Sequence, residues 1–184
     1  MWIDEIVFTK SVQEYFSFLK EKYNLEIQSK KCAECVSFKS DITWLEIWFD
    51  KYSLYIEMGM NNGLYQTSLG EIKQFITGES DSVSYMASDE EKLRKGLQRL
   101  SDYVKLYCHK ALYGDIEFYK EVKENQERLE RERALENKIN NIEELAKIAL
   151  KKHDYKKVID LYNQILEHLS PIQKKRLSMC EKYE

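Results

Sequence analysis

Three neighbouring segments rich in β-branched and aromatic residues restrict the possible folds of this chain more than any other feature. They cover residues 25–38, 42–49 and 53–60. The links between them, Ser40-Asp41 and Asp50-Lys51-Tyr52, are short and consist of residues that favour turns. Parallel neighbours would need a crossover of about a dozen residues, so these links predict an antiparallel meander.

The last two of these strands are apolar on both faces. Successive side chains of a strand point to opposite sides, so residues two apart share a face. One face is then aliphatic and predicts a core: Leu45, Ile47, Phe49, Leu54, Ile56, Met58, Met60. The second face mixes aromatic rings with carboxylates: Trp44, Glu46, Trp48, Tyr55, Glu57. Two interpretations of the second face stay open, a core covered by a helix and a docking surface for a partner.

Three capping boxes predict helices around the sheet. A serine is followed three residues later by glutamate at Ser11, Ser68 and Ser88. The apolar spacing after each serine predicts helices over about 11–23, from 68 to Gly78, and from 88 to Gly114. Asn24 is a plausible left-handed stop for the first of them. A short extended piece is expected around residues 83–86.

The composition narrows the class of protein. Of the 184 residues, 43% are hydrophobic and 13 are tyrosine, which is too much apolar material for a disordered chain. A formal net charge of −3 supplies no basic field for a phosphate backbone, so we expect no nucleic-acid partner. The N-terminus lacks the pattern of a secretory signal, and no apolar run is long enough to cross a membrane. We therefore expect a cytoplasmic protein with no membrane partner.

Past Gly114 the sequence becomes strongly charged and then regains a helical period. Residues 123–138 read KENQERLERERALENK and predict a solvated helical arm, with a weak coiled-coil contact as an alternative. Asn141 is then expected to cap a new helix, His153-Asp154 to break it, and a second helix to run from Tyr155 towards Pro171.

This last stretch, LAKIALKKHDYKKVIDLYNQILEHLSP, resembles a single tetratricopeptide repeat. The resemblance rests on the small residues Ala146 and Ala149, the turn at Asp154-Tyr155, the packing positions Val158, Tyr162 and Ile165, and Pro171. The sequence departs from the family at His153, where glycine is usual, and at Val158 and Ile165, where alanine is usual. One repeat cannot bury its apolar face alone, so we expect the hairpin to pack on other parts of the chain or on another molecule, with residues 172–183 as a capping helix.

The first 114 residues resemble small bacterial toxin-immunity proteins in their pattern. The features that carry the resemblance are the helix with Phe16, Leu19 and Tyr23, the hairpin ITWLEIWFDKYSLYIEMGM, the SLGEI helix and the closing LYGD. Such proteins bind a cognate toxin and occlude it, often through an acidic or aromatic surface. The resemblance thus implies a neutralising partner of immunity or antitoxin type.

The motifs that could carry chemistry are weak. Cys32 and Cys35 have the spacing of a zinc or redox pair, but an extended backbone would point them to opposite faces, and ordinary strand cysteines are expected. His109, His153 and His168 are isolated in sequence. Glu46 and Glu57 are expected to face each other across two strands, which is the arrangement of an acid–base pair. We expect no metal, no cofactor and no enzyme.

Together these patterns predict an α+β fold: an antiparallel sheet of three to four strands packed with helices, then an all-helical extension. We expect an α+β domain at 1–114, a charged helical connector at 115–140, and a helical hairpin with a capping helix at 141–184. The function expected is protein binding by occlusion, through Trp44, Glu46, Trp48, Tyr55 and Glu57. The alternative is an adaptor or a homodimer that uses C-terminal helices around Tyr155, Tyr162 and Leu166; a small enzyme comes last.

Overall fold

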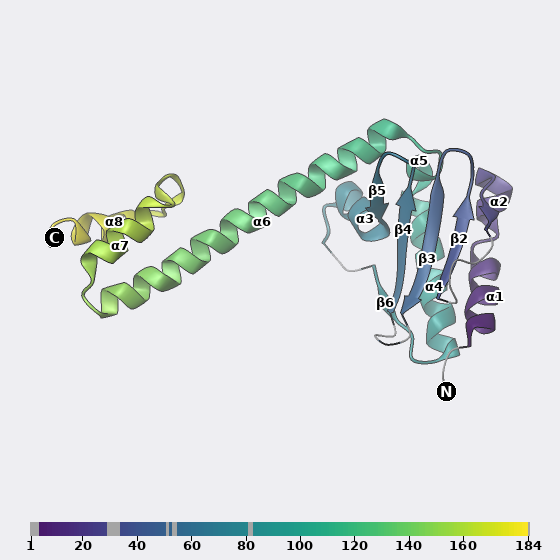
Figure 1. Cartoon of the computed structure of the whole chain (residues 1–184), viewed down its shortest axis with the longest axis horizontal. Coiled ribbons are helices and arrows are strands. Elements are labelled where there is room, and N and C mark those ends of the chain that lie inside the picture. The colour runs from purple at the N-terminus through teal and green to yellow at the C-terminus, as the bar shows by residue number, and fades with distance from the viewer. Residues whose placement is uncertain (1–3, 29–33, 51, 53–54, 81–82, 184) are drawn as a thin grey trace. The chain divides into compact units, whose positions relative to one another are not determined.

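A computed structural model describes residues 4–28, 34–50, 52, 55–80 and 83–183. It divides into two compact units, Met1–Gln126 and Glu127–Glu184. The N-terminal unit contains an antiparallel sheet with helices, and the C-terminal unit is helical, so the expected α+β class is confirmed (Figure 1).

The sheet is built on three long strands in a meander: β2 (Cys35–Lys39), β3 (Trp44–Asp50) and β4 (Tyr55–Asn61). Three short strands extend it: β1 (Glu26–Ile27) pairs with β2, and β5 (Gln66–Ser68) and β6 (Tyr85–Met86) both pair with β4. All of these pairs are antiparallel, as the short links predict. Since β3 occupies one side of β4, β5 and β6 share the other side.

One face of the sheet carries the core. Its side chains are at most 4% exposed: Val36, Phe38, Leu45, Ile47, Phe49, Met58, Met60. Side chains from each helix of this unit join the same buried cluster. In Figure 1 the helix α4 (Glu90–Tyr107) runs behind the strands, and a hydrogen bond of 2.8 Å from Ser101 Oγ to the Tyr15 carbonyl ties it to α1 (Glu5–Tyr15).

The helix boundaries differ in places from the expected ones. The first helix begins six residues earlier than predicted, because Asp4 caps it and Ser11 lies buried inside it. It is interrupted at Phe16-Ser17, and α2 (Phe18–Tyr23) ends at Asn24 in the left-handed conformation, as expected. The helix α3 (Leu69–Thr77) has the predicted capping box and ends at Gly78.

The long helix after Ser88 is also divided. Asp89 caps the start of α4, Cys108 is its C-terminal cap, and α5 (His109–Leu112) follows. The helix α6 then runs from Ile116 to Lys151, and its first turns place Phe118, Tyr119 and Val122 in the core of the N-terminal unit. The expected new helix at Asn141 is therefore wrong: α6 passes through this residue without a break.

The C-terminal unit has its own core. The end of α6, α7 (Tyr155–Asn163), a 3-10 turn (Leu166–His168) and α8 (Pro171–Cys180) enclose a second buried cluster that includes Ala146, Val158, Tyr162 and Leu177. Pro171 stands at the first position of α8 behind the cap Ser170. The chain turns back at His153-Asp154, as expected, but the first arm of the hairpin is the end of α6, and α7 ends at Asn163, short of the helix expected to run towards Pro171. The helix α8 lies where a capping helix was expected.

Candidate functional site

The face of the sheet opposite the core holds the polar and aromatic residues singled out from the sequence. Its described residues include Trp44, Glu46 and Trp48 on β3, which are half-buried, and Glu57 on β4, which is exposed. None of these residues belongs to the buried cluster that the helices complete. The predicted alternation is therefore correct along β3 and for Glu57, Met58 and Met60 of β4, and the two indoles lie outside the core. Leu54 and the side chains of Tyr55 and Ile56 lie outside the described part of the chain.

Trp44 lies at the end of β3 opposite Lys39 of β2. The Nζ atom of Lys39 is 5.6 Å from the centre of the Trp44 ring, which is the geometry of a cation–π contact. The lysine is exposed, so solvent surrounds this contact and it contributes little to stability. The indole is oriented by its neighbour and still reachable from outside.

Trp48 fits against a glycine of the next strand. A methyl group at Gly59 would lie 3.0 Å from Cζ3 and 3.1 Å from Cη2 of the indole, closer than carbon atoms normally approach. The absence of a side chain at this position is what lets the ring lie over β4. Glu57 is the direct cross-strand partner of Trp48, so its carboxylate rises from the same face beside the ring.

The expectation that Glu46 and Glu57 face each other is wrong. The register places Gly59 opposite Glu46, and Trp48 opposite Glu57, so the two carboxylates are diagonal neighbours. Glu46 instead accepts a hydrogen bond of 3.4 Å from Ser37 Oγ of β2. The arrangement provides two separate acidic positions and not a carboxylate pair.

Tyr55 begins β4 and its backbone pairs with Asp50 and Met86. Its side chain lies outside the part of the chain that the structure describes. The prediction that Tyr55 belongs to a contact surface stays a prediction.

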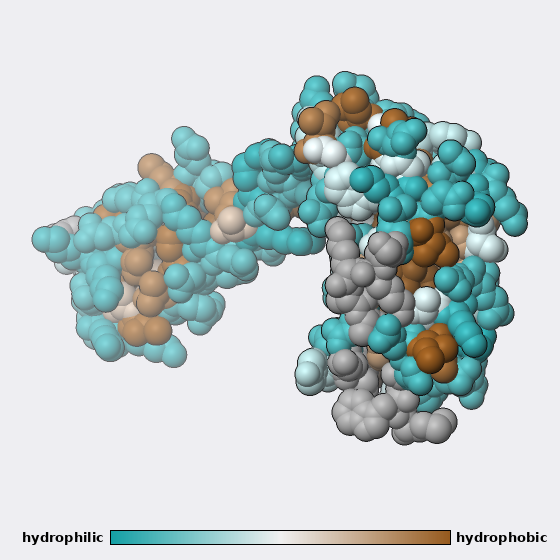
Figure 2. Space-filling view, turned by 45° about the vertical axis from the view of Figure 1, so that its right-hand side comes forward, coloured by the Kyte–Doolittle hydropathy of each residue, from teal (hydrophilic) through white to brown (hydrophobic). Residues whose placement is uncertain are grey.

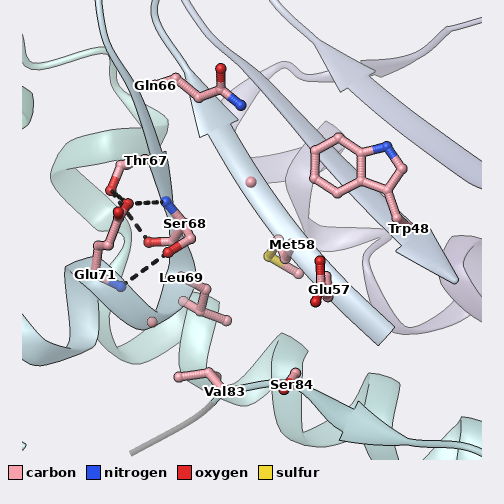
Figure 3. Close-up of a pocket in the computed structure, with 12 residues that line it drawn as sticks. Trp48, Glu57, Met58, Gln66, Thr67, Ser68, Leu69, Glu71, Val83 and Ser84 are labelled. Atoms are coloured by element: carbon pink, nitrogen blue, oxygen red, sulfur yellow. Dashed lines mark hydrogen bonds between the residues drawn. The ribbon is translucent and has the colours of Figure 1, made fainter. Parts of the chain in front are cut away.

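A pocket of about 670 Å³ opens next to Trp48 (Figure 3). It lies where β5 and β6 diverge along the same side of β4: β5 pairs with Gly59–Asn61, and β6 pairs with Tyr55 and Ile56. The lining residues come from four separate segments: Trp48, Glu57, Met58, Gly59, Gln66, Thr67, Ser68, Leu69, Gly70, Glu71, Val83, Ser84. Sequence reasoning found Trp48 and Glu57 but missed the pocket, because nothing local in residues 66–71 or 83–84 indicates that they meet.

The cysteines and histidines lie apart from this pocket. Cys35 is buried on β2, and Cys32 lies outside the described residues. Complete burial raises the pKa of the Cys108 thiol, which keeps it protonated near neutral pH. His109 packs among Tyr23 and Tyr113, with ring centres 6.0 and 4.8 Å away. Within the described ranges, no group of three potential metal-ligating side chains comes together.

No protein-family model, curated protein or solved structure matches this chain. Among the described helices, none is long and apolar enough to cross a membrane.

The C-terminal unit contains the second cluster of interacting polar groups. Glu143 of α6 accepts hydrogen bonds from Tyr162 Oη (3.0 Å) and Gln173 Nε2 (2.9 Å), and its other oxygen binds Arg176. Burial alone would raise the pKa of Glu143, but the hydrogen bonds from Gln173, Arg176 and Tyr162 outweigh it, and the pKa is lowered. This network joins three helices.

Apolar side chains also remain on the outside of this unit. Ile172 and Met179, two turns apart on α8, are 66% and 50% exposed, and Ile148 of α6 is 50% exposed. Figure 2 shows hydrophobic residues gathered in a band across the visible face of the unit. Tyr162, expected at the centre of a contact surface, is fully buried, so that assignment is wrong; Tyr155 is half-buried and Leu166 is 52% exposed.

Proposed function

We propose that this chain is a protein-binding module that neutralises a partner by covering part of its surface. The observation that carries the proposal is the pair of half-buried indoles, Trp44 and Trp48, on the face of the sheet opposite the core. No catalytic group is required for this function. The partner expected is a toxin or effector, as in the immunity and antitoxin class.

Physical arguments favour the indoles as anchors. Tryptophan is enriched among the residues that dominate binding energy, because one side chain buries a large apolar area and loses little conformational freedom. Here the Trp48 ring lies over Gly59, and Trp44 makes a weak cation–π contact with Lys39. Glu46 and Glu57 lie beside them and supply negative charge, which favours a partner with a basic surface.

The experiment is purification of the tagged full-length chain from its native cells, followed by mass spectrometry and light scattering of what co-elutes. The wild type is compared with Trp44→Ala, Trp48→Ala and the double variant. If the indoles anchor the partner, each truncation should weaken its binding by about thirtyfold or more, as for a residue worth about 2 kcal/mol. Tyr183→Ala, at an exposed tyrosine of the other unit, is the matched control.

A double variant that stays folded, as judged by its thermal unfolding, and keeps the partner at the original stoichiometry would contradict the proposal. The same purification tests the second candidate, an adaptor or self-associating protein. That candidate is favoured by the apolar residues Ile172 and Met179 of α8, which are exposed in the single chain and which a bound partner or a second copy could cover. If it is right, Ile172→Glu with Met179→Glu removes the partner or the dimer, and the tryptophan variants keep it.

A further inference from the structure

The pocket beside Trp48 has the shape and charge to receive a cation, and we propose that its ligand is an arginine side chain presented by the protein partner. The inference rests on the proposed function, since it names the group that the partner would insert. It goes beyond that function because the pocket draws on β5, α3 and residues 83–84 as well as on the two strands that carry the indoles.

The sheet itself creates the pocket. Between the residues that pair with β5 and those that pair with β6, Glu57 and Met58 of β4 have no described strand on their outer side. The chain leaves β5 at Ser68 to form α3 and returns at Val83 towards β6, so the sheet is split at this point (Figure 3). A volume of about 670 Å³ lies in the range of ordinary ligand sites and is ample for one guanidinium group with its aliphatic stem.

The lining is negatively charged. The described residues that line it include two carboxylates, Glu57 and Glu71, and no lysine, arginine or histidine. Glu71 is engaged within the protein: its Oε2 accepts hydrogen bonds from the Ser68 amide (2.7 Å) and from Thr67 Oγ1 (2.9 Å). Its full negative charge more than offsets the positive end of α3, which is equivalent to about half a charge. The field inside the pocket therefore favours a cation.

Glu57 is the carboxylate left to pair with a ligand. Its side chain is exposed, and it forms no hydrogen bond or ion pair with the rest of the described chain. Trp48 stands directly across from it, at the distance of a cross-strand neighbour. A cation that pairs with Glu57 thus lies next to the indole.

An aromatic face next to a carboxylate suits arginine better than lysine. The planar guanidinium stacks on an aromatic ring and offers paired N–H donors to a carboxylate at the same time, whereas an ammonium is a compact, strongly hydrated point charge. Gln66 and Ser84 also line the pocket. The amide oxygen of Gln66 and the hydroxyl oxygen of Ser84 can accept hydrogen bonds from the other N–H groups of the guanidinium.

The test is a titration of the full-length chain with Nα-acetyl-arginine amide, followed by NMR. We expect a saturable shift of the Trp48 indole N–H signal and of the Gly59 amide signal. Nα-acetyl-citrulline amide has nearly the same shape without the charge, and it should bind at least tenfold more weakly. Glu57→Gln should weaken the arginine probe at least fivefold, and Glu121→Gln, at an exposed glutamate of α6, should leave its binding unchanged.

Equal binding of the two probes, shifts confined to other residues, or an unchanged affinity in Glu57→Gln would each overturn the inference. Its failure can be told apart from failure of the proposed function. If the arginine probe does not bind but the tryptophan variants lose the partner, the inference falls and the proposed function stands. If the probe binds at Trp48 but the tryptophan variants keep the partner, the proposed function falls, and with it the assignment of the arginine to that partner.

Discussion

At the scale of single residues, His153 is in a conformation that its side chain disfavours. It lies in the turn just after α6 and has a φ of 57°, in the left-handed region that glycine adopts without strain. A β-carbon in this region costs about 1–2 kcal/mol, whereas glycine costs about 0.5–1 kcal/mol through the greater freedom of the unfolded chain.

We therefore expect His153→Gly to stabilise the C-terminal unit by about 0.5–1 kcal/mol, because removing the left-handed strain of the backbone gains more than the larger conformational entropy of the unfolded chain costs. The hydrogen bond of 3.2 Å between His153 Nδ1 and Tyr155 Oη is exposed and would be a small loss. The measurement is the thermal unfolding midpoint. His168→Gly is the control: His168 lies in a 3-10 turn, so its replacement should lower the midpoint. A fall in both variants would show that His153 is not strained.

At the scale of elements, the polar network around Glu143 holds three helices together. Its members are Glu143 on α6, Tyr162 on α7, and Gln173 and Arg176 on α8, and the glutamate side chain is 17% exposed. The C-terminal helices thus are not held together by apolar packing alone. Removing this largely buried carboxylate, or the groups that donate hydrogen bonds to it, should therefore lower the free energy of unfolding.

The lowered pKa of Glu143 gives this network a pH dependence. A carboxyl group with a lower pKa in the folded state binds fewer protons there than in the unfolded state, so it stabilises the fold above its ordinary pKa of about 4.5. We expect this stability to be complete at pH 7 and to be lost progressively as the pH falls below about 5 and through the folded-state pKa.

Glu143→Gln should lower the stability of the C-terminal unit at pH 7 by about 1–3 kcal/mol and flatten its pH dependence below pH 5. Chemical denaturation at pH 7, 5 and 4 measures both effects. The adjacent Glu144, whose side chain is 68% exposed, provides the matched control, and Glu144→Gln should change neither. If the stability of Glu143→Gln falls with pH as steeply as that of the wild type, the pH dependence comes from other carboxyl groups.

At the scale of the whole molecule, the two units have separate buried cores. The N-terminal cluster includes residues from α1 to the first turns of α6, and the C-terminal cluster begins at Ile142 of the same helix. Between them, the described residues 127–138 are joined by exposed pairs such as Arg128–Glu132, which contribute little to stability. Each core should therefore unfold as its own cooperative unit.

We expect two thermal transitions, which calorimetry of the intact chain would resolve. Val158→Ala, at a fully buried position of the C-terminal core, should lower one midpoint and leave the other in place. Leu97→Ala, equally buried in the N-terminal core, should do the reverse. A single transition that both variants shift together would show that the two cores unfold as one.

The pattern of short links and alternating residues was enough to predict the α+β class, the antiparallel meander, and the two faces of β3 and of the described part of β4. It was enough because an antiparallel turn and a period of two are local properties. Local signals also placed α3, from its capping box to Gly78. They failed at Asn141, because a residue that favours caps does not end a helix whose backbone ladder continues on both sides.

The tertiary structure alone decided the strand register, which separates Glu46 from Glu57, and the meeting of β5, α3 and residues 83–84 around Trp48. It also decided between the two roles expected for Tyr162, a packing position and a contact surface, by placing it in the core, and it showed that Gly59 admits the indole. Each of these depends on contacts between residues far apart in the chain or on different strands. Local stretches of sequence indicate which helices and strands form. Which side chains pack against one another depends on the folded chain as a whole.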